Sequence, residues 1–255
     1  MKLFFRVYGE GQPLIILHGL LGSSDNWLTQ AKFLSTAYKV YTVDLRNHGQ
    51  SPHDPAFDYE VMVGDLNEFI DEHQLSNPVI IGHSMGGKTA MNFALIHPEK
   101  VQKLIVVDIA PRAYNLEHYA LVEALCGLSI DTLTSRNEAD NLLAQQIPDA
   151  SVRQFLLKNL ARNQQGGFKW KVNLPVIRSK LSNVGADLLK TTTFNKPTLF
   201  IRGAKSNYVK DSDRDTILKI FPAAEIKTLD TGHWVQAEAP QQFVDTVTDW
   251  LKDSQ

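Results

Sequence analysis

The segment PVIIGHSMGGKTA, residues 78–90, joins an apolar run typical of a buried strand to a stretch with helical character. Between the two, residues 82–86 match the pattern G-x-S-x-G. A sharp strand-to-helix turn exposes the serine hydroxyl at the end of the strand, and small neighbours leave room for that turn. The pattern predicts Ser84 as a nucleophile, against the alternative of a helix-capping serine in a tight turn.

Short apolar runs alternate with longer amphipathic stretches on both sides of this segment. Because the runs are almost continuously apolar, we expect strands that are covered on both faces. Strand–helix alternation of this kind predicts an α/β fold with a mostly parallel central sheet and helices on both faces. The predicted strands begin at Leu14, Tyr38, Pro78, Lys103, Pro197 and Ala224, and helix-like segments span residues 26–34, 59–72, 85–96, 214–221 and 240–251.

The middle of the chain departs from this alternation. Residues 114–189 contain no clear buried strand, and the stretches 117–128, 138–147 and 152–161 have the apolar spacing of amphipathic helices. We therefore expect a core domain formed by residues 1–112 and 191–255. A helical cap insertion at residues 113–190 is expected to interrupt it.

Composition and charge argue against nucleic-acid binding, membrane-spanning segments and disulfide bonds. The 255 residues carry a formal net charge of −2 and no basic block, so nucleic acid is not an expected partner. No apolar run approaches the roughly 20 residues of a membrane span. Cys126 is the single cysteine, which excludes an internal disulfide and suits a reducing compartment. The N-terminus is too short and too polar for a signal peptide, so we expect a cytoplasmic protein.

A serine nucleophile needs a base, and His233 is the best-placed of the eight histidines. It lies in LDTGHWVQAEAP, after the last predicted strand and before the last predicted helix. Loops at the carboxyl ends of parallel strands meet at one edge of the sheet, where a base could reach Ser84. His83 flanks the nucleophile, and the turn geometry predicts that it points away and packs.

An oxyanion that forms during attack needs hydrogen-bond donors. One predicted donor is the backbone N–H of Met85, which follows the nucleophile and begins a helix whose positive dipole end faces the site. The second is expected from the loop after the first predicted strand, where we assign the N–H of Leu20, with Leu21 as the alternative. His18 is predicted to brace that loop.

Four stretches in this order resemble the α/β-hydrolase superfamily along nearly the whole chain. They are LHGLLGS (17–23), VDLRNHGQS (43–51), IGHSMGG (81–87) and DTGHW (230–234). The resemblance implies the α/β-hydrolase fold, a helical cap over the active site and a Ser-acid-His triad. It also implies a buttressing role, rather than chemistry, for Asp44, Arg46 and His48.

The acid of the triad departs from the usual pattern. In the superfamily it usually follows the strand that here reads PTLFIRG, but Asn207 stands at that position. VVDIAP (106–111) is similar to a group of small bacterial acyl esterases and thioesterases whose acid ends the strand after the nucleophile's. We therefore assign Asp108 as the acid, with Asp211 as the alternative. Asp211 and Asp213 are otherwise expected to cap the helix at 214–221.

These residues predict a serine hydrolase that cleaves the carboxylic ester or thioester bonds of small-molecule acyl substrates through a Ser-His-Asp triad and an acyl-enzyme. No cofactor or metal is expected, because neither a phosphate loop nor a metal-ligand spacing occurs. Two alternatives share the scaffold. One is a cofactor-free lyase of menaquinone synthesis or a perhydrolase, and the other is a binding module without chemistry. The acyl group, the leaving group and the oligomeric state stay open.

Overall fold

The computed structural model describes residues 1–115, 119–164 and 166–253. Its main sheet has seven strands in the order β1-β3-β2-β4-β5-β8-β9, and all neighbours run parallel except β1 and β3. The α/β-hydrolase fold predicted from the sequence is confirmed. The strands are β1 (Phe5–Tyr8), β2 (Gln12–Leu17), β3 (Tyr38–Val43), β4 (Val79–His83), β5 (Lys103–Val107), β8 (Thr198–Gly203) and β9 (Ala224–Leu229).

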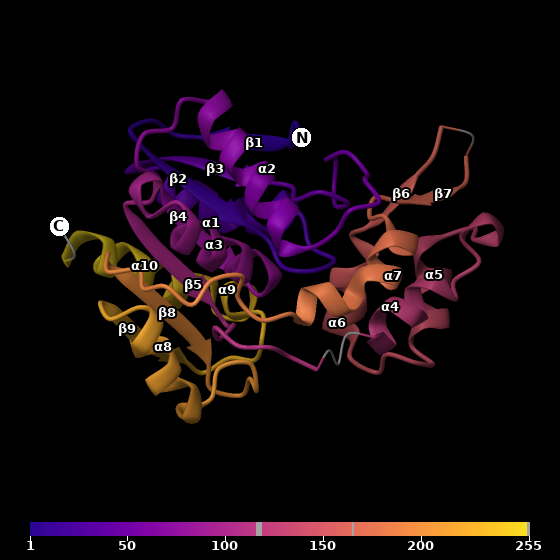
Figure 1. Cartoon of the computed structure of the whole chain (residues 1–255). Coiled ribbons are helices and arrows are strands. Elements are labelled where there is room, and N and C mark those ends of the chain that lie inside the picture. The colour runs from indigo at the N-terminus through magenta and orange to yellow at the C-terminus, as the bar shows by residue number, and fades with distance from the viewer. Residues whose placement is uncertain (116–118, 165, 254–255) are drawn as a thin grey trace.

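Helices cover both faces of the sheet (Figure 1). One face packs on α1 (Leu28–Leu34) and α10 (Pro240–Asp253), and Trp27 and Phe243 are among the rings buried there. The other face packs on α2 (Tyr59–Glu72), α3 (Met85–Ile96) and α8 (Arg214–Ile220). Successive residues of a strand point alternately into the apolar layers on the two faces of the sheet. Because both layers are apolar, each strand is an almost continuous apolar run in the sequence.

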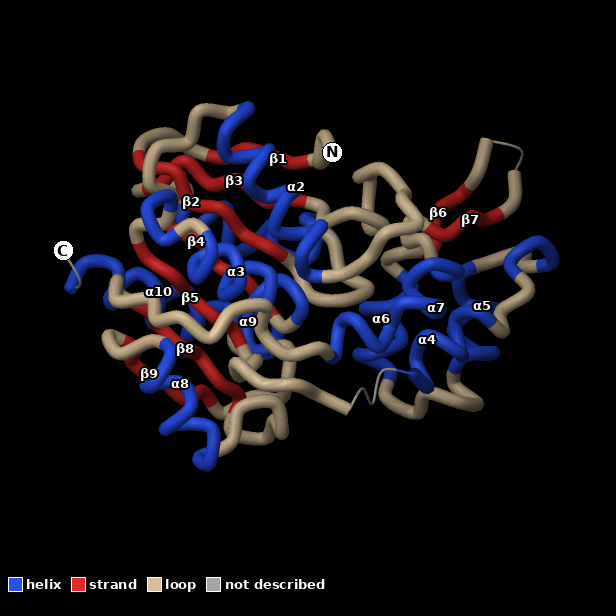
Figure 2. The backbone as a smooth tube through the Cα atoms, viewed as in Figure 1, coloured by secondary structure: helices blue, strands red, loops and turns tan. Residues whose placement is uncertain are grey.

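The inserted segment gathers beside the sheet as a group of helices with one small hairpin (Figure 2). Its helices are α4 (Tyr119–Cys126), α5 (Arg136–Leu143), α6 (Ala150–Leu157) and α7 (Leu174–Gly185). The hairpin pairs β6 (Leu160–Arg162) with β7 (Phe168–Trp170), where no strand was predicted. Strands of three residues are too short to produce a clear alternation in the sequence.

Hydrogen bonds in both directions join the inserted segment to the sheet domain. The Asn159 side chain donates to the carbonyl of Leu21 at 2.7 Å, and the Tyr59 hydroxyl donates to the carbonyl of Val184 at 2.7 Å. Both pairs are buried. The exact limits of the two domains, 113 and 190, stay predictions.

Short segments complete the architecture near the site. The four-residue helix α9 (Val235–Glu238) follows His233 and Trp234 directly. Single 3-10 turns lie at Ser24–Trp27, Pro98–Lys100, Ile130–Thr132 and Asp211–Asp213. Within the described ranges, no helix has the length and apolar character needed to cross a bilayer.

Candidate active site

Ser84 lies at the turn between β4 and α3 in a strained backbone conformation, with φ 52° and ψ −116°. A non-glycine residue in such a region costs on the order of 1–3 kcal/mol and persists only where its surroundings hold it. Here the Ser84 N–H donates to the carbonyl of Val107 at 3.0 Å, and the Ser84 carbonyl accepts from the N–H of Lys88 at 3.0 Å. The turn therefore fixes the serine between two buried strands and the first turn of α3.

The glycines on either side of Ser84 are required by close backbone approach. A Cβ on Gly82 would lie 2.3 Å from the carbonyl oxygen of Gly86. A Cβ on Gly86 would lie 2.5 Å from the carbonyl oxygens of Leu17 and His18. Any larger residue at either position would have to displace backbone, which explains the G-x-S-x-G spacing.

His233 and Asp108 form an ion-pair geometry next to Ser84. The His233 Nδ1 lies 2.8 Å from Oδ2 of Asp108, whose side chain is fully buried. Asp108 comes directly after β5 with φ 49°, and its N–H donates to the carbonyl of Ile201 at 2.8 Å. His233 and Ser84 line the same narrow cavity. The structure thus brings together the three side chains that the sequence placed at three separate strand ends.

Ser206 is a member of this group that sequence analysis missed. Its hydroxyl donates a short hydrogen bond to Asp108 Oδ2, the same oxygen that faces His233, and the Gly203 N–H donates to Oδ1 at 2.9 Å. The loop after β8 therefore supplies a hydroxyl to the Asp108 carboxylate, while Asn207 beside Ser206 is exposed. A single serine in a polar loop carries no sequence signal of this role.

Burial raises the pKa of Asp108 to about 6, although the hydrogen bonds from Ser206 and Gly203 and the charges of His83 and Arg202 favour its ionised form. Desolvation is the largest cause, since a carboxylate away from water loses its hydration. The ionised acid is thus held in place chiefly by donors that point at it.

The alternative acid, Asp211, lies elsewhere. Its side chain is 92% exposed and binds Arg202 at 2.6 Å. Asp213 binds Arg112 at 2.8 Å, and its Oδ2 accepts from the N–H of Lys210 at 2.9 Å. The expectation that these two aspartates cap α8 is wrong: Asp213 stands at the N-cap position, but neither side chain caps that helix. Pairing with nearby arginines takes up both carboxylates instead.

The two residues predicted to supply oxyanion donors both border Ser84. Leu20 and Met85 line one cavity together with Ser84, and Met85 is the first residue of α3, so its N–H has no acceptor within the helix. The alternative donor is occupied, because the N–H of Leu21 donates to Nε2 of His48 at 3.1 Å. Leu21 has φ 58°, in the left-handed region, at the turn of this loop. This geometry favours Leu20 over Leu21.

Two buried histidines brace the loop that carries Leu20. His18 Nε2 accepts from the N–H of Leu45 at 2.9 Å, and its Nδ1 lies 2.8 Å from the carbonyl of Gly19. His48 Nδ1 lies 2.9 Å from the carbonyl of Arg46. Each ring must therefore be neutral, with its proton on Nδ1 and its lone pair on Nε2. Desolvation lowers the pKa of His18 and lowers that of His48 to about 3.

Asp44 and Arg46 complete this support. Asp44 accepts from the N–H groups of Ser24 at 2.6 Å and Gln50 at 2.8 Å. Arg46 forms two hydrogen bonds with Asp65, at 2.6 and 2.9 Å, and both side chains are buried. These contacts are structural and hold the loops that surround the site.

The stability of the fold is expected to depend on His48 below neutral pH. The pKa of His48 in the folded chain, about 3, lies below its ordinary value of 6.5. At a pH between these two values, the unfolded chain binds a proton at His48 that the folded chain does not bind. Stability should fall as the pH drops below about 6.5. In His48→Gln, an amide can accept from Leu21 without titrating, so urea unfolding midpoints should fall less between pH 7.5 and pH 5 than in the wild type. His53→Gln, at an exposed histidine, is the matched control. An equal fall in the urea midpoint between pH 7.5 and pH 5 in both variants would contradict the role of His48 in this pH dependence.

His83 and Tyr208 hold the His233 imidazole from two sides. His83 was expected only to pack, but its Nε2 lies 2.9 Å from the carbonyl of His233, and its ring lines the cavity with Ser84. The Tyr208 ring stacks on His233 with a centroid distance of 4.0 Å and an interplanar angle of 23°. The His83 and His233 ring centroids lie 4.7 Å apart. The His233 imidazole is therefore oriented by Asp108 through Nδ1 and by two rings through packing.

Comparison with known proteins agrees with this fold. A family model described as "alpha/beta hydrolase fold" matches residues 12–126. The "sn-1-specific diacylglycerol lipase ABHD11" of Danio rerio is 38% identical over 253 residues, which are 96% of this chain and 80% of that protein. The chain belongs to the α/β-hydrolase family.

Within this α/β-hydrolase family the chain lies in a group that includes "Esterase YbfF" of Escherichia coli. That protein is 34% identical over 246 residues, covering 96% of this chain and 94% of its own. Among solved structures, one titled "Marine microorganism esterase" superimposes with a TM-score of 0.95 at 41% identity, covering 98% of this chain and 99% of that one. The predicted resemblance to small bacterial esterases of the α/β-hydrolase superfamily is confirmed at the level of the family.

Proposed function

We propose that the protein is a serine hydrolase that cleaves carboxylic esters, with Ser84 as nucleophile, His233 as base and Asp108 as the acid that orients the base. The observation that carries the proposal is the hydrogen bond between His233 Nδ1 and Asp108 Oδ2, at a cavity that Ser84 and His233 share. Relatives named esterase or lipase support ester hydrolysis as the reaction.

In the first half of the proposed reaction, Ser84 Oγ bonds to the carbonyl carbon of the ester while its proton passes to His233 Nε2. Asp108 holds the imidazole with its Nδ1 proton inward and stabilises the imidazolium. The tetrahedral intermediate expels the alcohol, which takes the proton from His233, and an acyl-enzyme on Ser84 is left. Water then attacks this acyl group with one of its protons going to His233, and the second tetrahedral intermediate expels Ser84 Oγ, which takes that proton from His233 as the carboxylic acid departs.

The negative charge on the carbonyl oxygen is proposed to be held by the N–H groups of Leu20 and Met85. Each donor of such an oxyanion hole contributes about 3 kcal/mol of transition-state stabilisation in a well-studied protease. The braced loop around Leu20 keeps its donor in place before substrate binds, so little reorganisation is needed during the reaction. Thioesters, which have the same carbonyl chemistry, and a cytoplasmic location stay predictions.

Hydrolysis of 4-nitrophenyl acetate tests this proposal. Formation of an acyl-enzyme should release a rapid burst of about one nitrophenolate per protein molecule, followed by slower steady turnover. Rapid-mixing absorbance measurements would show both phases, and added hydroxylamine should trap the acetyl group as the hydroxamate. Turnover without any trapped acyl group would contradict a covalent intermediate, and no turnover on nitrophenyl esters from acetyl to palmitoyl would contradict ester hydrolysis.

A further inference from the structure

Ser84 lies between two narrow cavities that have different walls. One is lined by Ser84 together with His233, Trp234 and side chains of α4 and α6 from the cap. The other is lined by Ser84 together with Met85, Ile109 and Val184. Leu20 borders both. We call the first the His233-side cavity and the second the Met85-side cavity.

The proposed chemistry assigns a different part of the ester to each cavity. His233 must protonate the oxygen that leaves, so the alcohol part has to lie in the His233-side cavity. The carbonyl oxygen faces the N–H groups of Leu20 and Met85, and the acyl chain continues on the other side of the tetrahedral carbon. The Met85-side cavity is therefore the acyl cavity.

The acyl cavity is small and its walls are fixed. Its volume is about 10 Å³, the space of about one water molecule, and the His233-side cavity has the same volume, so the two sides differ in what lies behind them. Tyr59, one of its walls, donates to the carbonyl of Val184 at 2.7 Å. Tyr114, another wall, accepts from the N–H of Ala110 at 2.7 Å and donates to the carbonyl of Tyr208. Enlarging this cavity for a long chain would break buried hydrogen bonds, which is costly.

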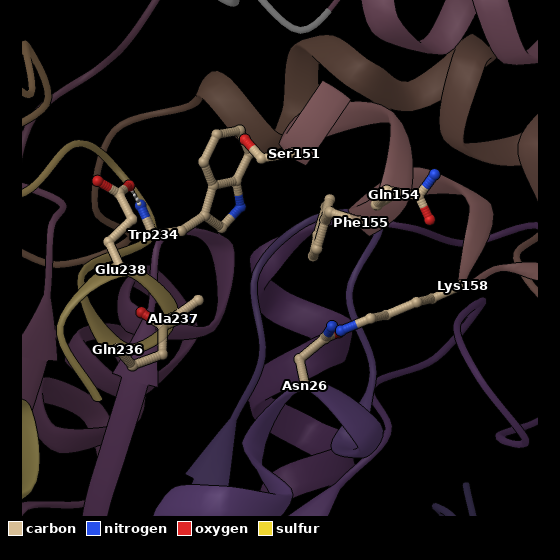
Figure 3. Close-up of a pocket in the computed structure, with 9 residues that line it drawn as sticks. All are labelled: Asn26, Ser151, Gln154, Phe155, Lys158, Trp234, Gln236, Ala237 and Glu238. Atoms are coloured by element: carbon tan, nitrogen blue, oxygen red, sulfur yellow. Dashed lines mark hydrogen bonds between the residues drawn. The ribbon is translucent and has the colours of Figure 1, made fainter. Parts of the chain in front are cut away.

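The His233-side cavity shares two of its walls with a much larger space. Phe155 and Trp234 wall the His233-side cavity and also wall an outer cavity of about 310 Å³, the size of a small-molecule site. Figure 3 shows the two rings on facing sides of this outer cavity, with Lys158 directed toward Asn26. The ring centroids lie 5.6 Å apart. The outer cavity is lined by α6 on one side and by α9 on the other.

We infer that the preferred substrate is an ester of a short-chain acid with a larger, mostly apolar alcohol, so that most of the substrate leaves with the alcohol. The inference rests on the proposed function and names the substrate class of the same site. A short acyl group fills the Met85-side cavity, the first part of the alcohol lies against the paired rings of Phe155 and Trp234, and the remainder occupies the outer cavity beyond them, between α6 and α9.

Two isomeric esters test this assignment directly. Octyl acetate and ethyl octanoate have the same atoms and nearly the same hydrophobicity, but their long chain lies on opposite sides of the carbonyl. We expect kcat/KM for octyl acetate to exceed that for ethyl octanoate by about tenfold or more, since even single methylene groups in a closed pocket discriminate strongly. Gas chromatography of the released octanol or ethanol measures both rates. Equal rates, or faster hydrolysis of ethyl octanoate, would overturn the assignment.

A variant in the outer cavity should change the preference for alcohol length, and a variant in the acyl cavity should change the preference for acyl length. Ala237→Phe fills the outer cavity, so the ratio of octyl acetate to ethyl acetate in kcat/KM should fall about fivefold. Val184→Ala widens the acyl cavity, so the ratio of ethyl octanoate to ethyl acetate should rise. Ala223→Phe is the control. It places the same ring on an exposed alanine at the amino-terminal end of β9, whereas the site lies at the carboxyl ends of the strands, so both ratios should stay at wild-type values.

The outcomes separate this inference from the proposed function. Two results overturn the substrate class and leave the serine hydrolase proposal intact. One is hydrolysis of the esters with no preference for octyl acetate. The other is a change in Ala237→Phe of the ratio of ethyl octanoate to ethyl acetate instead of the ratio of octyl acetate to ethyl acetate. Absence of hydrolysis for octyl acetate, ethyl octanoate, ethyl acetate and 4-nitrophenyl acetate alike overturns the proposed function, and the substrate class with it.

Discussion

Ser84→Ala is expected to lower kcat for 4-nitrophenyl acetate by about 10⁵-fold or more, the scale of loss when the nucleophile of a comparable triad is removed. The reason is that no other described side chain in the His233-side cavity carries a hydroxyl or thiol that could accept the acyl group. Steady-state kinetics with purified variant, checked against active-site titration of the wild type, would measure the loss.

The same variant should keep its fold. Alanine removes only the Ser84 oxygen, and no side-chain cap hydrogen bond to α3 is lost with it. The backbone contacts with Val107 and Lys88 do not depend on the side chain. Circular dichroism and the unfolding temperature are therefore the controls. An unchanged fold with wild-type kcat would show that Ser84 is not the nucleophile.

Asp108→Asn is expected to lower kcat by about 10⁴-fold, by analogy with the corresponding change in a protease triad. An amide NH₂ cannot accept the Nδ1 proton of His233 as the buried carboxylate does, so the imidazole adopts the wrong tautomer and its cation is not stabilised. Asp211→Asn is the matched control, since it removes one exposed carboxylate that binds Arg202 and should leave kcat within about twofold. A silent Asp108→Asn together with an inactive Asp211→Asn would reverse the assignment.

The pKa of Asp108 gives this substitution a second readout. Its folded-state value, about 6, lies above the ordinary 3.8, so the folded chain holds a proton on Asp108 that the unfolded chain releases between these values. Above about pH 6 the buried charge therefore costs stability. Asp108→Asn should leave the unfolding temperature at pH 8 equal to or higher than that of the wild type, while activity is lost.

In the wild type, kcat/KM should decline as the pH falls through about 6, because the Asp108 carboxylate becomes neutral.

Much of the fold and the grouping of the site residues could be predicted because the signals are local or topological. Continuous apolar runs identify strands buried on both faces, and parallel strands bring their carboxyl ends to one edge. The resemblance to a group of small acyl esterases was also needed to assign Asp108, whereas Ser84 and His233 were placed together by this strand logic. The strand logic missed β1, whose residues are only partly buried at the edge of the sheet, and the hairpin of β6 and β7, whose strands are three residues long.

The parts that could not be predicted depend on which side chains converge in space. Ser206 reaches Asp108 across 98 positions of sequence, and His83 reaches the carbonyl of His233 across 150. Neither contact leaves a periodic pattern or a motif. The cavities on the two sides of Ser84 likewise depend on cap residues such as Phe155 and Val184, whose packing against the core follows from tertiary structure alone.

Labelling with a fluorophosphonate probe tests the central claim most directly, because the probe reacts with a serine only where a base and an oxyanion hole activate it. After digestion, mass spectrometry should locate the adduct on the peptide that contains Ser84, with about one label per protein molecule. His233→Ala should abolish the label. An unlabelled native protein, or a label on a serine other than Ser84, would contradict the serine hydrolase assignment and favour a binding module on the α/β-hydrolase scaffold.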